Sequence, residues 1–341
     1  MKNLIQRINQ LLKEAKFETF VFDFTSNINK FCYDLIVKRN DLVFIIKVFP
    51  NIDNIDEDII KGIKILSKLL NSKPLLIGVK NRYKNLEDNT IYLRSDLPFI
   101  TFNSLKRILK NKLYPFILSQ RGGGIVFIDG KLLKTLREEK NVTRKELSEE
   151  IGITKRTLCS YESENMRPSK NIAKKIGEIL DSKAIFREIN VFNWNIKINF
   201  KIEEINKKED LNNFEEHIQN IIEDIGIKSN WYKNGLFPFD MLISPQNWDN
   251  YSENQIYPLF SDIANIKDEF DKNALLSLFT FTKVFHKDAL FIVDNDFKFQ
   301  NFNSTFKIPV IKIRTLEKID NEDEFIDYVK KSKIPPSGEQ K

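Results

Sequence analysis

Between residues 129 and 181, apolar side chains recur three and four positions apart in short runs separated by polar or glycine-containing turns. This spacing predicts a series of short amphipathic helices. Thr143 with Glu146 three residues later fits a capping box at a helix start, and Gly152 suits the left-handed position that ends the same helix. Thr154 and Ser169 are candidate N-caps of two further helices. The apolar positions expected to share one core are Leu132, Leu133, Leu136, Leu147, Ile151, Leu158, Tyr161, Ile172, Ile176, Ile179 and Leu180.

Residues 1–118 have a different pattern, in which short apolar runs predict strands and longer amphipathic segments predict helices. The predicted helices are 3–15, 56–71 and 104–112, and the predicted strands are 17–24, 32–39, 42–49, 74–80, 90–93 and 98–102. This order of elements predicts an α/β domain.

Residues 190–333 predict a second α/β domain. The predicted helices are 214–226, one around 275–279 and 321–331, and the predicted strands are 237–244, 289–295 and 308–316. The order nearly repeats that of the first domain, with 237–244, 289–295 and 308–313 matching 32–39, 74–80 and 97–102. We therefore expect the second domain to be a repeat of the first.

The segment 119–128 contains three consecutive glycines at 122–124, and no Lys-Ser or Lys-Thr pair follows them. We expect a Gly-rich linker here, because the phosphate-binding alternative needs that pair. The helical module then spans 129–184. The tail 334–341 is expected to be disordered.

The positive charge of the chain is concentrated in one segment. The net charge of the 341-residue chain is +6, but residues 154–175 carry six Lys or Arg against two Glu. A local excess of cations suits the neutralisation of phosphates. The two cysteines, Cys32 and Cys159, and the two histidines, His217 and His286, lack metal-ligand spacing, so no metal and no cofactor is expected. Apolar runs are too short for a membrane span and no signal peptide is visible, so we expect a cytoplasmic protein without membrane contact.

The helical module is similar to a known family. Its spacing L-R-x(5)-T-x-x-E-L-x-x-x-I-G-I-T-x-x-T-L-x-x-Y-E-x(4)-R-P resembles the lambda-repressor or Cro type of helix-turn-helix (the XRE type). The sequence RGGG at 121–124 followed by IVFIDG, between two larger flanks, resembles archaeal HTH-type transcriptional regulatory proteins of about this length.

The resemblance implies that residues 154–163 form the recognition helix, which lies in the major groove of DNA. The positions that the family uses for base contacts are Lys155, Arg156, Cys159 and Ser160. Arg156 is the best candidate for a two-pronged contact with guanine. Expected contacts with phosphates or the minor groove are Thr143, Arg144, Thr157, Arg167 and Lys170. Arg137 and Glu162 fall on positions that form an internal ion pair with a structural role.

The sequence departs from the family at two positions where glutamine is common, because it has Arg144 and Lys155 there. The family's base code therefore does not transfer, and the target sequence is not predicted.

The first flank resembles the restriction-endonuclease-like fold, because Asp34 lies on one predicted strand and Lys47 on the next. An active nuclease of this type needs an acid two residues before the lysine, and Ile45 stands there. The domain is therefore expected to be degenerate and without catalytic residues. Asp240 occupies the place of Asp34 in the second flank, where an ordinary strand-end acid is the simpler interpretation.

Together these features predict α/β flanking domains around a central all-α helix-turn-helix domain, in a sequence-specific transcriptional regulator that is not an enzyme. Its expected partners are double-stranded DNA and a second copy of the chain, since a two-fold dimer doubles the bases read. The flanks would dimerise, sense an effector or contact the transcription machinery. Two alternatives stay open: a nuclease targeted by the helix-turn-helix, and an assembly module without DNA binding.

Overall fold

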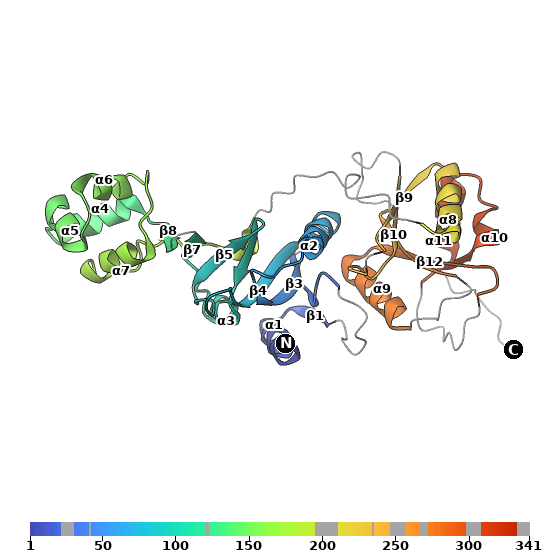
Figure 1. The fold of residues 1–341 in the computed structure, drawn as a ribbon, viewed down its shortest axis with the longest axis horizontal. Helices are drawn as coiled ribbons and strands as arrows, with labels where there is room; N and C mark the ends of the chain where they lie inside the picture. Colours follow the sequence, from blue (N-terminus) through green and yellow to red (C-terminus); the bar gives the residue numbers. More distant parts are fainter. Residues whose placement is uncertain are drawn as a thin grey trace. The chain divides into compact units, whose positions relative to one another are not determined.

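The computed structural model describes residues 1–21, 31–40, 42–120, 123–194, 211–233, 235–245, 257–265, 272–297 and 308–332. These residues form two compact units (Figure 1). The first holds the described residues of 1–21 and 33–194, and the second holds Phe31, Cys32 and the described residues from 211 onward. The expected disordered tail and the end of the predicted strand 17–24 lie outside the described residues.

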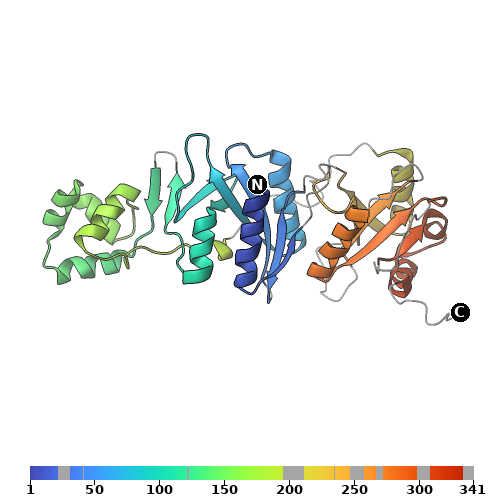
Figure 2. The same ribbon diagram turned by 90° about the horizontal axis from the view of Figure 1, so that it is seen from below.

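The first unit is built on an eight-stranded sheet with the order β1-β2-β3-β4-β6-β5-β7-β8. Its strands are β1 (Glu18–Val21), β2 (Leu35–Arg39), β3 (Leu42–Asn51), β4 (Lys73–Lys80), β5 (Thr90–Arg94), β6 (Leu97–Ile100), β7 (Ile117–Gln120) and β8 (Gly123–Val126). Helices α1 (Lys2–Glu14), α2 (Glu57–Leu69) and α3 (Phe102–Asn111) complete the α/β domain (Figure 2). The first three strands are antiparallel, and α2 then crosses over to make β4 parallel to β3.

Local chemistry explains the helix starts in this domain. The side chain of Asp56 accepts a hydrogen bond from the Asp58 backbone N–H at the start of α2. Thr101 caps α3 in the same way, by accepting from the Ser104 N–H. Each cap satisfies a backbone donor that the first helical turn leaves without a partner.

The expected Gly-rich linker at 119–128 is wrong for the described part of that segment. Gly123–Val126 form β8, which pairs antiparallel with β7. A Cβ on Gly124 would lie 2.7 Å from Cγ2 of Ile117, so this glycine permits close packing. Arg121 and Gly122 lie outside the described residues. The run of glycines predicted a flexible linker, but Gly124 instead lies in a packed strand that has no room for a side chain.

Four helices follow the hairpin: α4 (Gly130–Glu139), α5 (Arg144–Ile151), α6 (Lys155–Glu162) and α7 (Lys170–Ile179). The predicted caps Thr143, Thr154 and Ser169 are confirmed, Thr143 in a full capping box with Glu146. Gly152 ends α5 with the expected left-handed conformation, at φ 79°.

The core of this helical domain includes residues of the hairpin. The buried cluster consists of Ile117, Val126, Ile128, Leu133, Leu147, Ile151, Leu158, Tyr161, Ala173, Ile176, Leu180 and Ile185. The segment that leaves the helices returns to the α/β domain, since the Ile189 N–H donates to the Pro115 carbonyl at 2.7 Å and Phe192 packs on Phe44. The helices are therefore joined to the sheet at both their entry and their exit.

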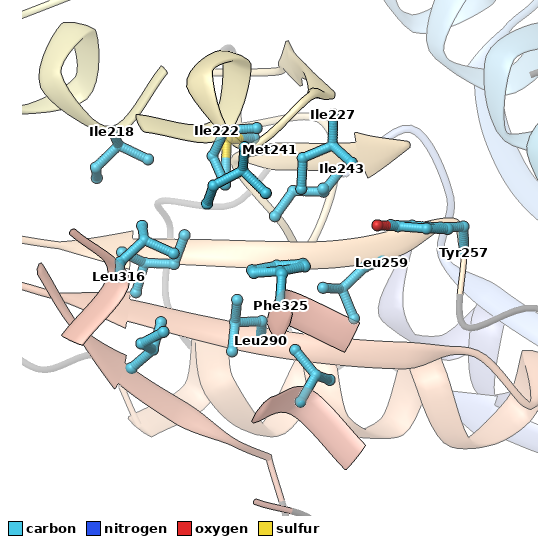
Figure 3. Packing of buried hydrophobic residues seen from close by; sticks show 14 of the residues in the cluster. Ile218, Ile222, Ile227, Met241, Ile243, Tyr257, Leu259, Leu290, Leu316 and Phe325 are labelled. Carbon is cyan, nitrogen blue, oxygen red and sulfur yellow. The ribbon is translucent and has the colours of Figure 1, made fainter. Parts of the chain in front are cut away.

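The second unit contains a five-stranded sheet with the order β13-β12-β11-β10-β9. Its strands are β9 (Ile227–Trp231), β10 (Met241–Pro245), β11 (Leu259–Ala264), β12 (Asp288–Val293) and β13 (Val310–Lys312). Its helices are α8 (Asn213–Asp224), α9 (Lys272–Phe285), α10 (Ile313–Leu316) and α11 (Glu322–Ser332). In Figure 3, Ile218 and Ile222 of α8 face Met241 and Ile243 of the sheet, and Phe325 of α11 lies beside Leu290.

The order and directions of these strands match those of β1-β2-β3-β4-β6, with three antiparallel strands, a crossover helix and two parallel strands. Strands β9 and β11 were not predicted. The strand predicted over 308–316 is too long, because only Val310–Lys312 are a strand and the chain turns at once into α10. Continuous apolar runs do not distinguish a strand from a short buried helix.

None of the helices within the described ranges combines the length and the apolar character needed to cross a membrane.

Gly130 provides a test of the packing between α4 and α6. A Cβ there would lie 2.2 Å from the Glu162 carbonyl oxygen, which is rigid backbone. Alanine normally stabilises a helix relative to glycine, but here we expect Gly130→Ala to destabilise the helical domain by about 1–3 kcal/mol, as overpacking does.

Hydrogen exchange of the α4 and α6 amides in the full chain measures this change. Lys134→Ala, at an exposed position of the same helix, is the control and should shift stability by less than about 0.5 kcal/mol. Unchanged or increased protection in Gly130→Ala would contradict the close approach of the two helices.

Candidate nucleic-acid interface

Helix α6 has one buried and one exposed face. Leu158 and Tyr161 are buried in the helical core, whereas Lys155, Arg156 and Cys159 are exposed. Ser160 is half-buried and its hydroxyl donates to the Arg156 carbonyl at 3.1 Å. The predicted base-contact residues thus lie along one side of the helix, three of them open to a ligand.

The start of α6 is suited to an anion. Oγ1 of Thr154 accepts a hydrogen bond from the Thr157 N–H at 3.1 Å, and the two threonine hydroxyls lie 2.9 Å apart. Lys155 and Arg156 follow in the first turn, where the positive end of the helix dipole adds to their charge. This end of the helix therefore has the electrostatic character that a phosphate backbone attracts.

Glu162, at the other end of α6, is a buried acid with two arginine partners. Arg137 Nε lies 2.7 Å from Glu162 Oε1, and Arg144 Nε lies 2.7 Å from Oε2. The side chains of Glu162 and Arg137 are only 4% and 6% exposed. Because one carboxylate binds groups from α4 and α5, it fixes the orientation of α6 against both.

Arg144 was expected to contact phosphate, and the structure shows what positions it. The hydrogen bond and charge of Glu162 raise the pKa of Arg144 and hold its guanidinium against α6. The phosphate contact of Arg144 stays a prediction, as does that of Thr143, whose hydroxyl accepts the Glu146 N–H in the capping box.

The turn after α6 is attached to the hairpin. The guanidinium of Arg167 lies 4.0 Å from the centre of the Phe127 ring, a cation–π contact. The Val126 N–H donates to the Pro168 carbonyl at 3.0 Å, and Ile125 forms a bridge with Ser169. The turn that carries Arg167 is therefore continuous with the sheet of the α/β domain.

Lys170, the first residue of α7, forms an ion pair with Glu87 of the α/β domain. Glu87 also binds Lys84, and these hydrogen bonds, that of Lys170 foremost, lower the pKa of Glu87 to about 2. A phosphate contact by Lys170 would have to share the lysine with Glu87. Glu87 was not predicted as a partner of Lys170, because 83 residues separate the two and no periodic pattern links them.

The nuclease-like position of the first unit contains an ion pair. Asp34 Oδ1 lies 2.9 Å from Lys47 Nζ, and Asp34 Oδ2 accepts the Val48 N–H at 2.7 Å. Ile45, two residues before the lysine, is fully buried. Both oxygens of Asp34 are already bonded and its expected carboxylate partner is an alkyl group, so these residues do not fit a divalent cation.

The equivalent position of the second unit differs again. Asp240 precedes β10 as Asp34 precedes β2, and its N–H donates to the Ser261 carbonyl at 3.0 Å. The strand register places Asp262 where Lys47 stands in the first unit. Burial raises the pKa of Asp240, opposed by a hydrogen bond with Asp262. Within the described residues, no three His, Cys, Asp or Glu side chains are grouped so that they could hold a metal ion.

Comparison with known proteins agrees with the division of the first unit into an α/β domain and a helical domain. Residues 1–115 match the model of the PD-(D/E)XK superfamily domain, and residues 133–185 match that of the helix-turn-helix domain. The architecture is thus a nuclease-like α/β domain, a helix-turn-helix of the Cro type and a second α/β unit.

The chain is also similar over nearly its whole length to archaeal proteins that carry the name "Putative HTH-type transcriptional regulatory protein". The one from Methanocaldococcus jannaschii is 28% identical over 328 residues, 96% of each chain. Those from Methanobrevibacter smithii and Pyrococcus abyssi are 28% and 24% identical, over 97% of this chain and 97% and 98% of theirs. No solved structure matches the chain.

Removal of Arg137 tests the role of the buried carboxylate. We expect Arg137→Ala to destabilise the helical domain by about 3–5 kcal/mol, because Glu162 would lose one of its two charged partners while remaining buried. Hydrogen exchange in α5 and α6 of the full chain measures the loss. Lys145→Ala, which removes a cation whose side chain is 76% exposed, is the control and should change little. An effect of Arg137→Ala no larger than that of the control would show that the pair is not structural.

Proposed function

We propose that this protein is a sequence-specific, DNA-binding transcriptional regulator that reads the major groove with α6. The observation that carries the proposal is the division of α6 into a buried face with Leu158 and Tyr161 and an exposed face with Lys155, Arg156 and Cys159. The names of the archaeal relatives and the match of residues 133–185 to the helix-turn-helix model support it.

The DNA contact proposed for each residue follows from the chemistry of its side chain. Arg156 has a planar guanidinium whose two donors have the spacing of the acceptors O6 and N7 of guanine. Lys155 serves either a guanine or a phosphate. Cys159 and Ser160 are small and contact bases through short-range packing or a single hydrogen bond. Arg167 and Arg144, each held by a partner in the protein, are assigned to the phosphate backbone, which fixes register without reading sequence.

We propose further that DNA is bound by a homodimer. One eight-residue helix reads few base pairs, and a two-fold pair of helices doubles the contact. The bound sites should then contain inverted half-sites separated by about one helical turn, roughly 34–36 Å.

Selection of duplexes from a random pool by the full chain tests this function, and Arg156→Ala tests the assignment of the helix. We expect Arg156→Ala to lose about 1–3 kcal/mol of discrimination at one base pair of each half-site, because the bidentate contact is removed. Competition binding between the selected duplex and its single-base variants measures this quantity.

The matched control is Lys174→Ala, which removes a cation whose side chain is 75% exposed on α7. It should leave base preference unchanged. Equal base preference in Arg156→Ala and the unaltered protein would refute the recognition-helix assignment. A purified protein without salt-dependent affinity for any duplex would favour the assembly module instead.

A second candidate, a helix-turn-helix-targeted nuclease, is suggested by the match of residues 1–115 to the PD-(D/E)XK model. The pairing of Asp34 with Lys47 and the alkyl side chain of Ile45 argue against it. We therefore expect the full chain to leave selected and unrelated duplexes intact with Mg²⁺ or Mn²⁺, as judged by gel analysis of end-labelled DNA. Cleavage that disappears in Asp34→Asn but persists in Asp53→Asn would establish the nuclease.

A further inference from the structure

The loop between β4 and β5, here called the β4–β5 loop and comprising residues 81–89, presents an aromatic residue between two cations. Tyr83 is 87% exposed, and Arg82 and Lys84 beside it are exposed as well. A tyrosine so exposed gains nothing from the core of its own domain. Two basic side chains beside an exposed aromatic ring are instead suited to the charged sugar-phosphate surface of a nucleic acid.

The loop is held in place by its own hydrogen bonds. Asn81 Oδ1 accepts the backbone N–H groups of Tyr83 and Lys84 at 2.9 and 2.7 Å. Asp53 Oδ2 accepts the Arg82 N–H at 2.7 Å, and Leu86 is buried at the base of the loop. Because the backbone is already ordered, a ligand can bind these side chains without the cost of ordering the loop.

The base of the loop contacts the helix-turn-helix domain. Glu87 binds Lys84 within the loop and Lys170 at the start of α7, next to the turn with Arg167. Lys84, Glu87 and Lys170 have a net charge of +1, and Arg82 balances the neighbouring Asp88, so this cluster keeps a net positive charge. Glu87 and Tyr83 are separated by four residue steps, so their Cα atoms lie at most ~14 Å apart, which is the axial length of about eight duplex phosphates at ~1.7 Å each.

We propose that the β4–β5 loop is a second contact with duplex DNA, which extends the footprint of the helix-turn-helix along the phosphate backbone. Arg82 and Lys84 each neutralise a phosphate, and Tyr83 packs on the sugar-phosphate backbone beside them. This inference rests on the proposed DNA-binding function. It assigns to the first α/β domain a role in affinity, without reading of base sequence.

The test compares the full chain with the double variant Arg82→Ala/Lys84→Ala on a duplex obtained by selection with the unaltered protein. Association constants are measured over a range of salt concentrations. Each lost phosphate contact should reduce the slope of log K against log salt by about 0.9, so the double variant should lose about 1.8 of the slope. On a duplex trimmed to the base pairs whose identity the selection fixes, the two proteins should have the same slope.

The control is Lys13→Ala/Lys106→Ala, which removes two exposed cations from α1 and α3 of the same domain. It should keep the slope of the unaltered protein on both duplexes. Tyr83→Ala should weaken binding to the long duplex while base preference stays the same.

The outcomes separate this inference from the function on which it rests. If the unaltered protein has no salt-dependent affinity for duplex, the proposed function itself fails. If it binds, and the double variant keeps the full slope on the long duplex, the loop does not contact DNA. A double variant that instead loses self-association, as seen by sedimentation, with an unchanged slope would identify the loop as a protein contact and likewise overturn the proposal.

Discussion

The arrangement of the helix-turn-helix depends on one buried carboxylate. Glu162 has almost no exposed surface, and an unpaired charge in that position would be strongly unfavourable. Its two oxygens bind Arg137 of α4 and Arg144 of α5, so the three helices are tied to one another at the carboxyl end of α6. This constraint decides which side of α6 packs inward on Leu158 and Tyr161, and therefore which side chains face outward.

The second constraint is that the helices share a buried core with the neighbouring sheet. Ile117 and Val126 of the β7–β8 hairpin belong to the same buried cluster as the helical residues. The pairing of Lys170 with Glu87 and the packing of Arg167 on Phe127 add contacts at the edge of the proposed DNA surface. The nuclease-like domain of the first unit is thus an immediate neighbour of that surface. Through these contacts the domain can affect the binding of DNA even though its residues do not fit a metal ion.

The sequence was most informative where structure is local. Thr143, Gly152, Thr154 and Ser169 act through bonds and dihedral angles within a few residues, and each was predicted correctly. The Arg137 and Glu162 positions came from the resemblance to a known family. The predicted Gly-rich linker was wrong at Gly124, because the close packing of this glycine depends on Ile117 of the neighbouring strand, a contact that exists only in the folded chain. The partners of Lys170 and Arg167 could not be predicted, because they depend on tertiary contacts between separate elements. The strand β13 was predicted too long because its apolar run continues into α10.

The proposed function requires the exposed face of α6 to enter the major groove and contact guanine. Methylation interference on a selected duplex tests it most directly, because dimethyl sulfate places a methyl group on guanine N7 in the major groove and on adenine N3 in the minor groove. We expect N7 methylation of at least one guanine in each half-site to prevent binding by the full chain, and binding to recover when Arg156 is replaced by alanine. Interference at adenine N3 alone, or interference at guanine that Arg156→Ala leaves unaltered, would contradict it.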